Sequence, residues 1–194
     1  MAITDSLPDN SPQLIAEKIG RLVRRAFGDV ERDVVMAESF QIWQLSQSAV
    51  QQGAHHHLSF AELVQNTGRW HHQIRIAGQP RGFAWSLQEE GARRDRWSIR
   101  HLEASPLALK LETSIVLLDN HLPEDDKSVA RLLLVPSWQI HGIWLTGADL
   151  DAVWVFDCPG RLSVEEDTLY DPSDFLSMLA QDRPTDGFID YPIP

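Results

Sequence analysis

The chain has 194 residues and a mass of 22.0 kDa, a length that predicts one globular domain. Its single cysteine, Cys158, excludes an intrachain disulfide framework. Hydrophobic residues make up 43% of the chain and charged residues 23%, so we expect a folded, soluble protein. Residues 1–10 lack the apolar segment of a signal peptide, and no apolar run approaches the length of a membrane span. We therefore expect a cytoplasmic protein without a membrane partner.

The net charge of −11 comes from the C-terminal half of the chain. Residues 1–100 contain 12 basic and 11 acidic residues, whereas residues 101–194 contain 5 basic and 17 acidic residues. A negative protein repels nucleic-acid phosphates, so we predict no nucleic-acid partner. The asymmetry has two interpretations, an acidic face kept for solubility or a dipolar surface that orients a partner, and the first is the more common.

The first predicted element is a helix from Ser11 to Gly28. Pro12 suits its first turn, apolar residues recur at helical spacing, and basic residues occupy another face. The segment Asp33–Leu45 mixes β-branched and aromatic residues with Gln, and it fits a strand or a second helix. Residues 51–57, which end in three consecutive histidines, predict a polar loop.

A capping box then predicts a short helix. Ser59 and Glu62 have the spacing of the box, and Leu58 and Leu63 have the spacing of a hydrophobic staple. The helix is expected to end near Gly68. The three histidines would then precede a helix N-terminus.

Alternation with a period of two predicts a three-stranded meander from Arg69 onward. Residues 78–82 (GQPRG) predict a five-residue turn, after which residues 83–87 alternate back. Residues 91–96 predict a second, charged turn, and residues 97–103 predict the third strand. One face of the first strand would carry Trp70, His72, Ile74 and Ile76, and the other His71, Gln73 and Arg75.

The C-terminal half predicts two further helices and three strands. Leu107–Leu118 fits a helix better than a strand, and Asp171-Pro172 starts a helix whose buried stripe contains Phe175 and Leu176. The strand-like runs are residues 129–135, 139–145 and 152–156. Residues 184–194 contain three prolines and no periodic pattern, so we expect an extended C-terminal tail.

These elements predict an α+β fold in one domain. Connections within each group of three strands are too short for parallel crossovers, which favours a largely antiparallel sheet of about six strands. A mixed sheet is the open alternative, and we expect three to four helices. A domain boundary near Leu122–Lys127 is conceivable, but each part alone would have a small core.

Histidines offer the clearest metal hypothesis. Five of the eight occur in residues 55–57 and 71–72. Imidazole is the commonest metal ligand, and the candidate site consists of His55, His57 and His72. The sequence has no HExxH motif and no cysteine pair, and a polar loop without a physiological metal is the more common meaning of such a run.

The lone Cys158 offers a thiol hypothesis. It follows a predicted strand, His141 could act as the base, and Asp149 or Asp151 could orient that histidine. A lone cysteine is usually inert, and the neighbouring Asp157 disfavours a thiolate. We interpret the acidic residues that follow as surface acids, because they lack the spacing of a calcium loop. They are Glu165, Glu166 and Asp167, and we interpret Asp149 and Asp151 as acids of a turn between strands.

Tryptophan and arginine residues offer a binding hypothesis. The seven tryptophans fit core packing better than a stacking platform for a sugar or base. A cluster of arginines lies beside Trp97 and could bind the acidic surface of a protein partner. The candidate binding residues are Arg93, Arg94, Arg96, Trp97 and Arg100.

The leading functional hypothesis is a cytoplasmic binding or protein-interaction domain without catalytic activity. The sequence has no phosphate-binding glycine loop and no GxSxG elbow, so we expect no cofactor. We also expect a homodimer, because the strands at residues 70–76 and 83–87 would present sheet edges that must be covered. The alternative is a metal-dependent or thiol hydrolase that uses the histidine loop at 55–57 or Cys158.

Overall fold

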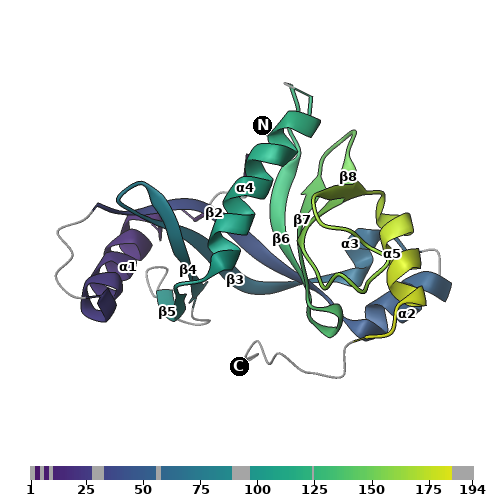
Figure 1. Cartoon of the computed structure of the whole chain (residues 1–194), viewed down its shortest axis with the longest axis horizontal. Helices are drawn as coiled ribbons and strands as arrows, with labels where there is room; N and C mark the ends of the chain where they lie inside the picture. The colour runs from purple at the N-terminus through teal and green to yellow at the C-terminus, as the bar shows by residue number, and fades with distance from the viewer. Residues whose placement is uncertain are drawn as a thin grey trace. The chain divides into compact units, whose positions relative to one another are not determined.

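The computed structural model describes residues 3–4, 7–8, 11–27, 33–55, 58–88, 97–123 and 125–184 (Figure 1). The strands in these ranges are β1 (Ile3–Thr4), β2 (Val34–Leu45), β3 (Val64–Ile76), β4 (Gln79–Gln88), β5 (Trp97–Glu103), β6 (Val129–Val135), β7 (Ile140–Thr146), β8 (Asp151–Asp157) and β9 (Thr168–Tyr170). The helices are α1 (Ser11–Phe27), α2 (Gln47–His55), α3 (Phe60–Leu63), α4 (Pro106–His121), α5 (Pro172–Gln181) and a 3-10 turn, η1 (Pro136–Trp138). No helix in the described ranges is both long and apolar enough to cross a membrane.

The chain forms two compact units whose segments interleave. Unit 1 contains Met1–Ile3, Ile42–Thr67 and Ser114–Pro194, and unit 2 contains Thr4–Gln41 and Gly68–Thr113. The limits of the units fall inside β1, β2, β3 and α4, so these elements have residues in both. The expected single domain stays a prediction.

The fold is α+β, with a large, mostly antiparallel mixed sheet. The strand order is β5-β4-β3-β2-β6-β7-β8-β9, and β1 pairs with β6. β2 and β6 run parallel, with Ile42 opposite Leu132. The sheet is larger than the expected six or so strands, because Asp33–Leu45 forms a strand and the short β1 and β9 were not predicted.

The two strands expected to form exposed edges lie inside the sheet. β3 lies between β4 and β2, and β4 lies between β5 and β3. The end positions belong to β5 and β9. The argument from unpaired edges therefore does not apply to these strands, and the homodimer stays a prediction without that support.

Unit 2 contains the predicted meander, β3-β4-β5. The first turn consists of Ala77 and Gly78, whose φ angles of 53° and 76° suit the type I′ turn of a two-residue hairpin. The predicted five-residue turn is wrong, because Gln79 already pairs with Ile76. A bulge beside Arg75 takes up the extra residue in the hairpin.

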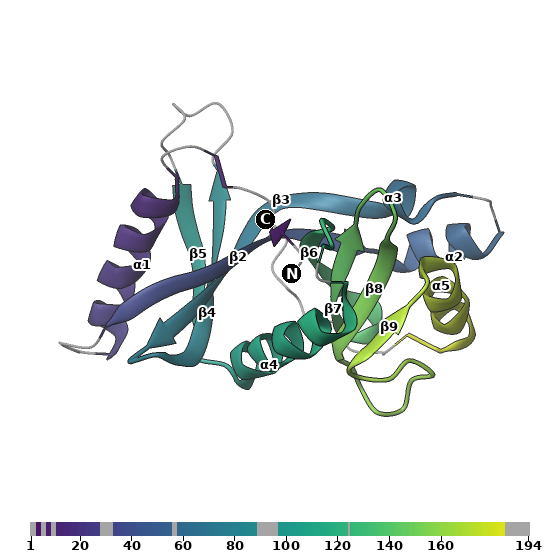
Figure 2. The same cartoon turned by 90° about the horizontal axis from the view of Figure 1, so that it is seen from above.

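α1 covers one face of this meander, as Figure 2 shows. The apolar stripe of the helix is buried against the strands, which confirms the predicted amphipathic helix. The Trp97 Nε1 atom donates a hydrogen bond to Ser11 Oγ at 3.0 Å, which connects β5 to the first turn of α1. The buried residues of this core are Ile15, Ile19, Val23, Trp70, Ile74, Ala84 and Trp97.

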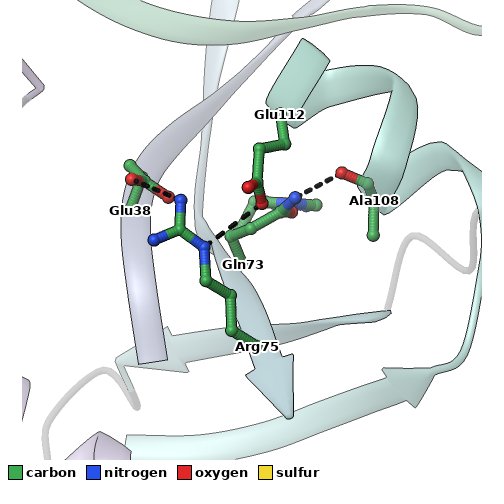
Figure 3. A network of polar contacts seen from close by, with 6 residues as sticks. Glu38, Gln73, Arg75, Ala108 and Glu112 are labelled. Carbon is green, nitrogen blue, oxygen red and sulfur yellow. Dashed lines mark hydrogen bonds and ion pairs between the residues drawn. The ribbon is translucent and has the colours of Figure 1, made fainter. Parts of the chain in front are cut away.

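α4 is bound to β3 and β2 through polar contacts (Figure 3). Gln73, which is buried, donates from Nε2 to the carbonyl oxygen of Ala108. Arg75 reaches Glu112 on α4 at 3.2 Å and Glu38 on β2 at 3.4 Å, so one guanidinium bridges two carboxylates. The prediction that Leu107–Leu118 is helical is confirmed, because α4 contains it. The contacts of Gln73 and Arg75 explain why the face of β3 that carries them is polar.

Unit 1 contains the predicted strands β6, β7 and β8 and the predicted helix α5. α2 and α5 lie side by side in Figures 1 and 2. Their apolar residues share one core with β6, β7 and β8. The largest side chains of this core are Trp138, Trp144, Phe60 and Phe175, and Leu176 and Leu179 from the predicted stripe also belong to it.

Residues 51–55 are helical, so the predicted polar loop is wrong for them. Ser46 Oγ accepts a hydrogen bond from Ala49 N–H at 3.2 Å in the first turn of α2. Ala49 and Val50 are buried, whereas Gln51 and Gln52 are exposed. The polar residues therefore form the outer face of an amphipathic helix, which brings the described helices to five instead of three to four.

The capping box at Ser59 is confirmed, but the helix that follows is shorter than predicted. α3 ends at Leu63, and β3 already begins at Val64 instead of near Gly68. Buried Val64 is β-branched and packs in the core as part of a strand. Leu58 is 41% exposed, and the predicted hydrophobic staple between Leu58 and Leu63 stays a prediction.

Replacing Gly82 by alanine is expected to destabilise unit 2. A β-carbon at this position would lie 2.1 Å from the carbonyl oxygen of Glu103 on β5, so the strand pair would have to move apart. We expect a loss of about 1 to 3 kcal/mol in the free energy of unfolding, measured by urea titration. Gly160→Ala is the control, because a β-carbon there meets no atom within 4 Å. Equal stability of the two variants would contradict the prediction.

Candidate binding pocket

A pocket of about 390 Å³ lies in unit 1 where the first turns of α3 and α5 face the start of β8. Its volume falls within the range of small-ligand sites. Both polar and apolar residues line the pocket. They belong to α2, α3, β8 and α5 with its N-cap, and to the segment before α3. The lining residues are Gly53, Leu58, Ser59, Phe60, Asp151, Asp171, Pro172, Ser173, Leu176 and Ser177.

The capping residues of two helices supply much of the polar lining. Asp171 is the N-cap of α5 and accepts a hydrogen bond from Ser173 N–H at 2.8 Å. Ser59 precedes α3, and its N–H donates to Glu62 Oε2 at 2.8 Å. Capping satisfies backbone N–H groups that have no partner within a helix. Ser59 and Asp171 therefore cap the N-termini of two helices and also line the pocket.

Asp171 is held in its ionised form. The hydroxyl and then the backbone N–H of Ser173 donate to this carboxylate, and these hydrogen bonds lower the pKa of Asp171 below its ordinary value. The hydroxyl contact is 2.5 Å long. The pocket therefore carries this negative charge at neutral pH.

A stacked group of side chains positions the second carboxylate. Trp144 Nε1 donates to Asp151 Oδ1 at 2.8 Å. The Trp144 ring lies edge-on to Trp43, and the Arg131 guanidinium carbon lies 5.0 Å from the centroid of each ring. Such cation–π contacts restrict both rings. Asp151 is thus an exposed carboxylate whose position is fixed by its hydrogen bond to the packed Trp144 ring. It is not the partner of His141, which pairs with Asp157.

The structure describes two of the three residues of the histidine hypothesis. His55 is the last residue of α2, and His57 lies outside the described residues. His72 is fully buried in β3, with Nδ1 2.9 Å from Ser39 Oγ and Nε2 2.6 Å from Ser86 Oγ. Among the residues that the structure describes, no group of three His, Cys, Asp or Glu side chains is arranged to hold a metal ion.

The tryptophan and arginine cluster is described only in part. Trp97 is 2% exposed and its indole packs in the core of unit 2. Arg100 belongs to β5, whereas Arg93, Arg94 and Arg96 lie outside the described residues. The binding role of this cluster stays a prediction.

Of the predicted thiol, base and acid, the structure pairs the base with an acid, but with a different acid from the expected one. His141 Nδ1 lies 3.0 Å from Asp157 Oδ2, and the two residues are paired across β7 and β8. The Cys158 thiol lies 3.5 Å from the carbonyl oxygen of Val164, to which it can donate. Asp149 and Asp151 were expected to orient His141, but Asp157 is directly opposite it in the register.

The pocket residues were present in the sequence as signals for helix ends. The capping box at Ser59 and the Asp171-Pro172 start of a helix were both recognised, and Asp151 was interpreted as a turn acid. The sequence did not reveal that Ser59, Asp151 and Asp171 line one pocket. Comparisons of the chain with protein-family models, curated proteins and solved structures found no match.

Proposed function

We propose that this protein is a binding domain without catalytic activity, and that its ligand enters the pocket in unit 1. The pocket itself is the observation that supports this function, because it combines a site-sized volume with convergent polar groups and an apolar wall. None of the described lining residues is a histidine or a cysteine. The serine hydroxyls there donate to Glu62, to Asp171 and to the Ser173 carbonyl oxygen, which is not the serine–histidine arrangement of a hydrolase triad.

The experiment is a titration of the isotope-labelled full chain with small probes, followed by amide NMR. The probes are n-butylammonium, n-butanol, butyrate and glucose. We expect at least one of them to shift the signals of residues around Phe60 and Leu176, with a dissociation constant on the order of millimolar. Ser177→Trp should fill the pocket and abolish the shifts, whereas Ala180→Trp, an exposed position on the same helix outside the pocket, should preserve them. Absence of any shift with all four probes would contradict the proposal.

A thiol hydrolase is the second candidate, supported by the His141–Asp157 contact next to Cys158. Hydrolysis of p-nitrophenyl acetate separates the two functions. The binding proposal expects the same background rate for the wild type and for Cys158→Ser. A burst of nitrophenol that disappears in Cys158→Ser would favour the hydrolase instead.

A further inference from the structure

The ligand class of the pocket follows from where its hydroxyl protons point, and this inference rests on the proposed function. Ser59 Oγ donates to Glu62 Oε2 at 2.8 Å, Ser173 Oγ donates to Asp171 Oδ1 at 2.5 Å, and Ser177 Oγ donates to the Ser173 carbonyl oxygen at 2.8 Å. A hydroxyl has one proton to donate and two lone pairs. All three serines therefore have only lone pairs left for a ligand.

Two backbone donors among the lining residues are also occupied. The N–H groups of Ser59 and Ser173 already donate to Glu62 and Asp171. Ionised carboxylates accept hydrogen bonds and cannot donate them. The contacts of these residues thus leave the ligand a set of acceptors, so the group that fits must be a hydrogen-bond donor.

The charge of the pocket selects a cation among the donors. Asp151 and Asp171 line it, and none of the ten described lining residues is lysine, arginine or histidine. The N-terminus of α5 contributes roughly half a positive charge, which is smaller than the two negative charges of the carboxylates. The local field is therefore negative, in agreement with the acidic C-terminal half of the chain.

An apolar wall lies beside these acceptors. Leu58 is 41% exposed, and Phe60, Pro172 and Leu176 complete the wall. This arrangement suits a cationic head on a hydrocarbon stem. An ammonium has three donors that can reach acceptors in several directions, whereas a guanidinium prefers one planar carboxylate or an exposed aromatic face. Phe60, the aromatic residue among the described lining residues, is 4% exposed.

We propose that the pocket binds a primary ammonium group on a hydrocarbon stem, supplied either by a lysine side chain of a protein partner or by a free alkylamine. The ammonium would lie between Asp151 and Asp171, and the methylenes of the stem would contact Leu58 and Leu176. A divalent metal ion suits the site less well, because the described residues contain no group of three ligating side chains.

The test compares two blocked peptides, Ac-Gly-Lys-Gly-NH2 and Ac-Gly-Nle-Gly-NH2, which differ by the ammonium group. In amide NMR titrations of the full chain we expect the lysine peptide to bind about tenfold more tightly than the norleucine peptide. Raising NaCl from low to physiological concentration should weaken only the lysine peptide. Equal binding of the two peptides would overturn this inference and leave the proposed function intact.

Variants that keep the fold provide the second comparison. In Asp151→Asn/Asp171→Asn, the first amide would still accept from Trp144, and asparagine caps a helix as well as aspartate does. The double variant therefore removes charge and preserves both structural roles. This variant should bind the lysine peptide about tenfold less tightly. Asp125→Asn/Glu165→Gln, with the same change in net charge at exposed sites outside the pocket, should bind like the wild type.

The remaining outcomes also decide the question. If n-butylammonium binds as tightly as the lysine peptide, a free alkylamine is the source of the ammonium group; if it binds more weakly, a lysine of a protein partner is the source. If neither peptide binds while n-butanol or glucose still shifts the pocket signals, the inference fails and the proposed function survives. If nothing binds, both fail.

Discussion

Replacing Trp144 by alanine is expected to lower the free energy of unfolding by about 3 to 5 kcal/mol. The side chain is 2% exposed, and its ring centroid lies 5.2 Å from that of Trp43 and 5.7 Å from that of Phe60. The Arg131 guanidinium stacks beside it. These neighbours come from β2, α3 and β6, so no single side-chain movement can close the cavity.

Trp144→Phe separates the packing of the ring from its hydrogen bond. A phenyl ring keeps much of the apolar contact but loses the N–H that donates to Asp151 at 2.8 Å. We expect a smaller loss of about 1 to 3 kcal/mol, together with weaker binding of the lysine peptide because Asp151 is no longer held.

Urea unfolding followed by circular dichroism measures both Trp144 variants. Leu109→Ala is the control, because Leu109 is 58% exposed on α4, and its effect should stay within about 0.5 kcal/mol. A Trp144→Ala protein as stable as this control would show that the indole does not support the core of unit 1.

Several helices and strands could be predicted from the sequence because their periodicity and capping residues lie within short segments. The period of two in β3 and β4 and the period of 3.6 in α1 depend only on neighbouring residues, and the strands and the amphipathic helix were predicted from them. The capping box at Ser59 and the helix start at Asp171 are also local. Alternation further implies that Trp70 and Trp85 point to opposite faces, because Trp85 pairs with His71, and this argues against one shared aromatic platform.

Features that depend on distant partners were missed. The segment QQGAHH has weak helical signals by itself, and α2 forms because Ala49 and Val50 pack in the core that α5 completes. The parallel pairing of β2 with β6 brings together strands separated by six other elements. The pocket needs Ser59, Asp151 and Asp171 to converge, and no periodic pattern connects them.

Lowering the pH from 7 to 5 is expected to reduce the free energy of unfolding through His72. The ring is fully buried, and this burial, followed by the positive charge of neighbouring His71, lowers the pKa of His72 from 6.5 to about 3. Its nitrogens contact Ser39 and Ser86, whose hydroxyls can donate to one nitrogen and accept from the other when the ring is neutral.

The sign of the effect follows from proton binding by the two states. Above pH 6.5 the ring is neutral in both the folded and unfolded chain, so it adds no pH dependence. Between pH 6.5 and about 3 the unfolded chain binds the proton and the folded chain does not, so stability falls as the pH falls. Between pH 7 and 5 this linkage amounts to about 2 kcal/mol.

His72→Gln provides the test, because glutamine carries no charge in this range and can both donate to and accept from the two serines. The variant should be less stable than the wild type at pH 7, where it packs less well. Its loss of stability between pH 7 and 5, from urea titrations at both pH values, should be smaller by about 2 kcal/mol. His121→Gln, at the exposed end of α4, should keep the wild-type difference. If His72→Gln lost as much stability as the wild type over this range, the acid sensitivity would come from other groups, and the buried ring between Ser39 and Ser86 would have no part in it.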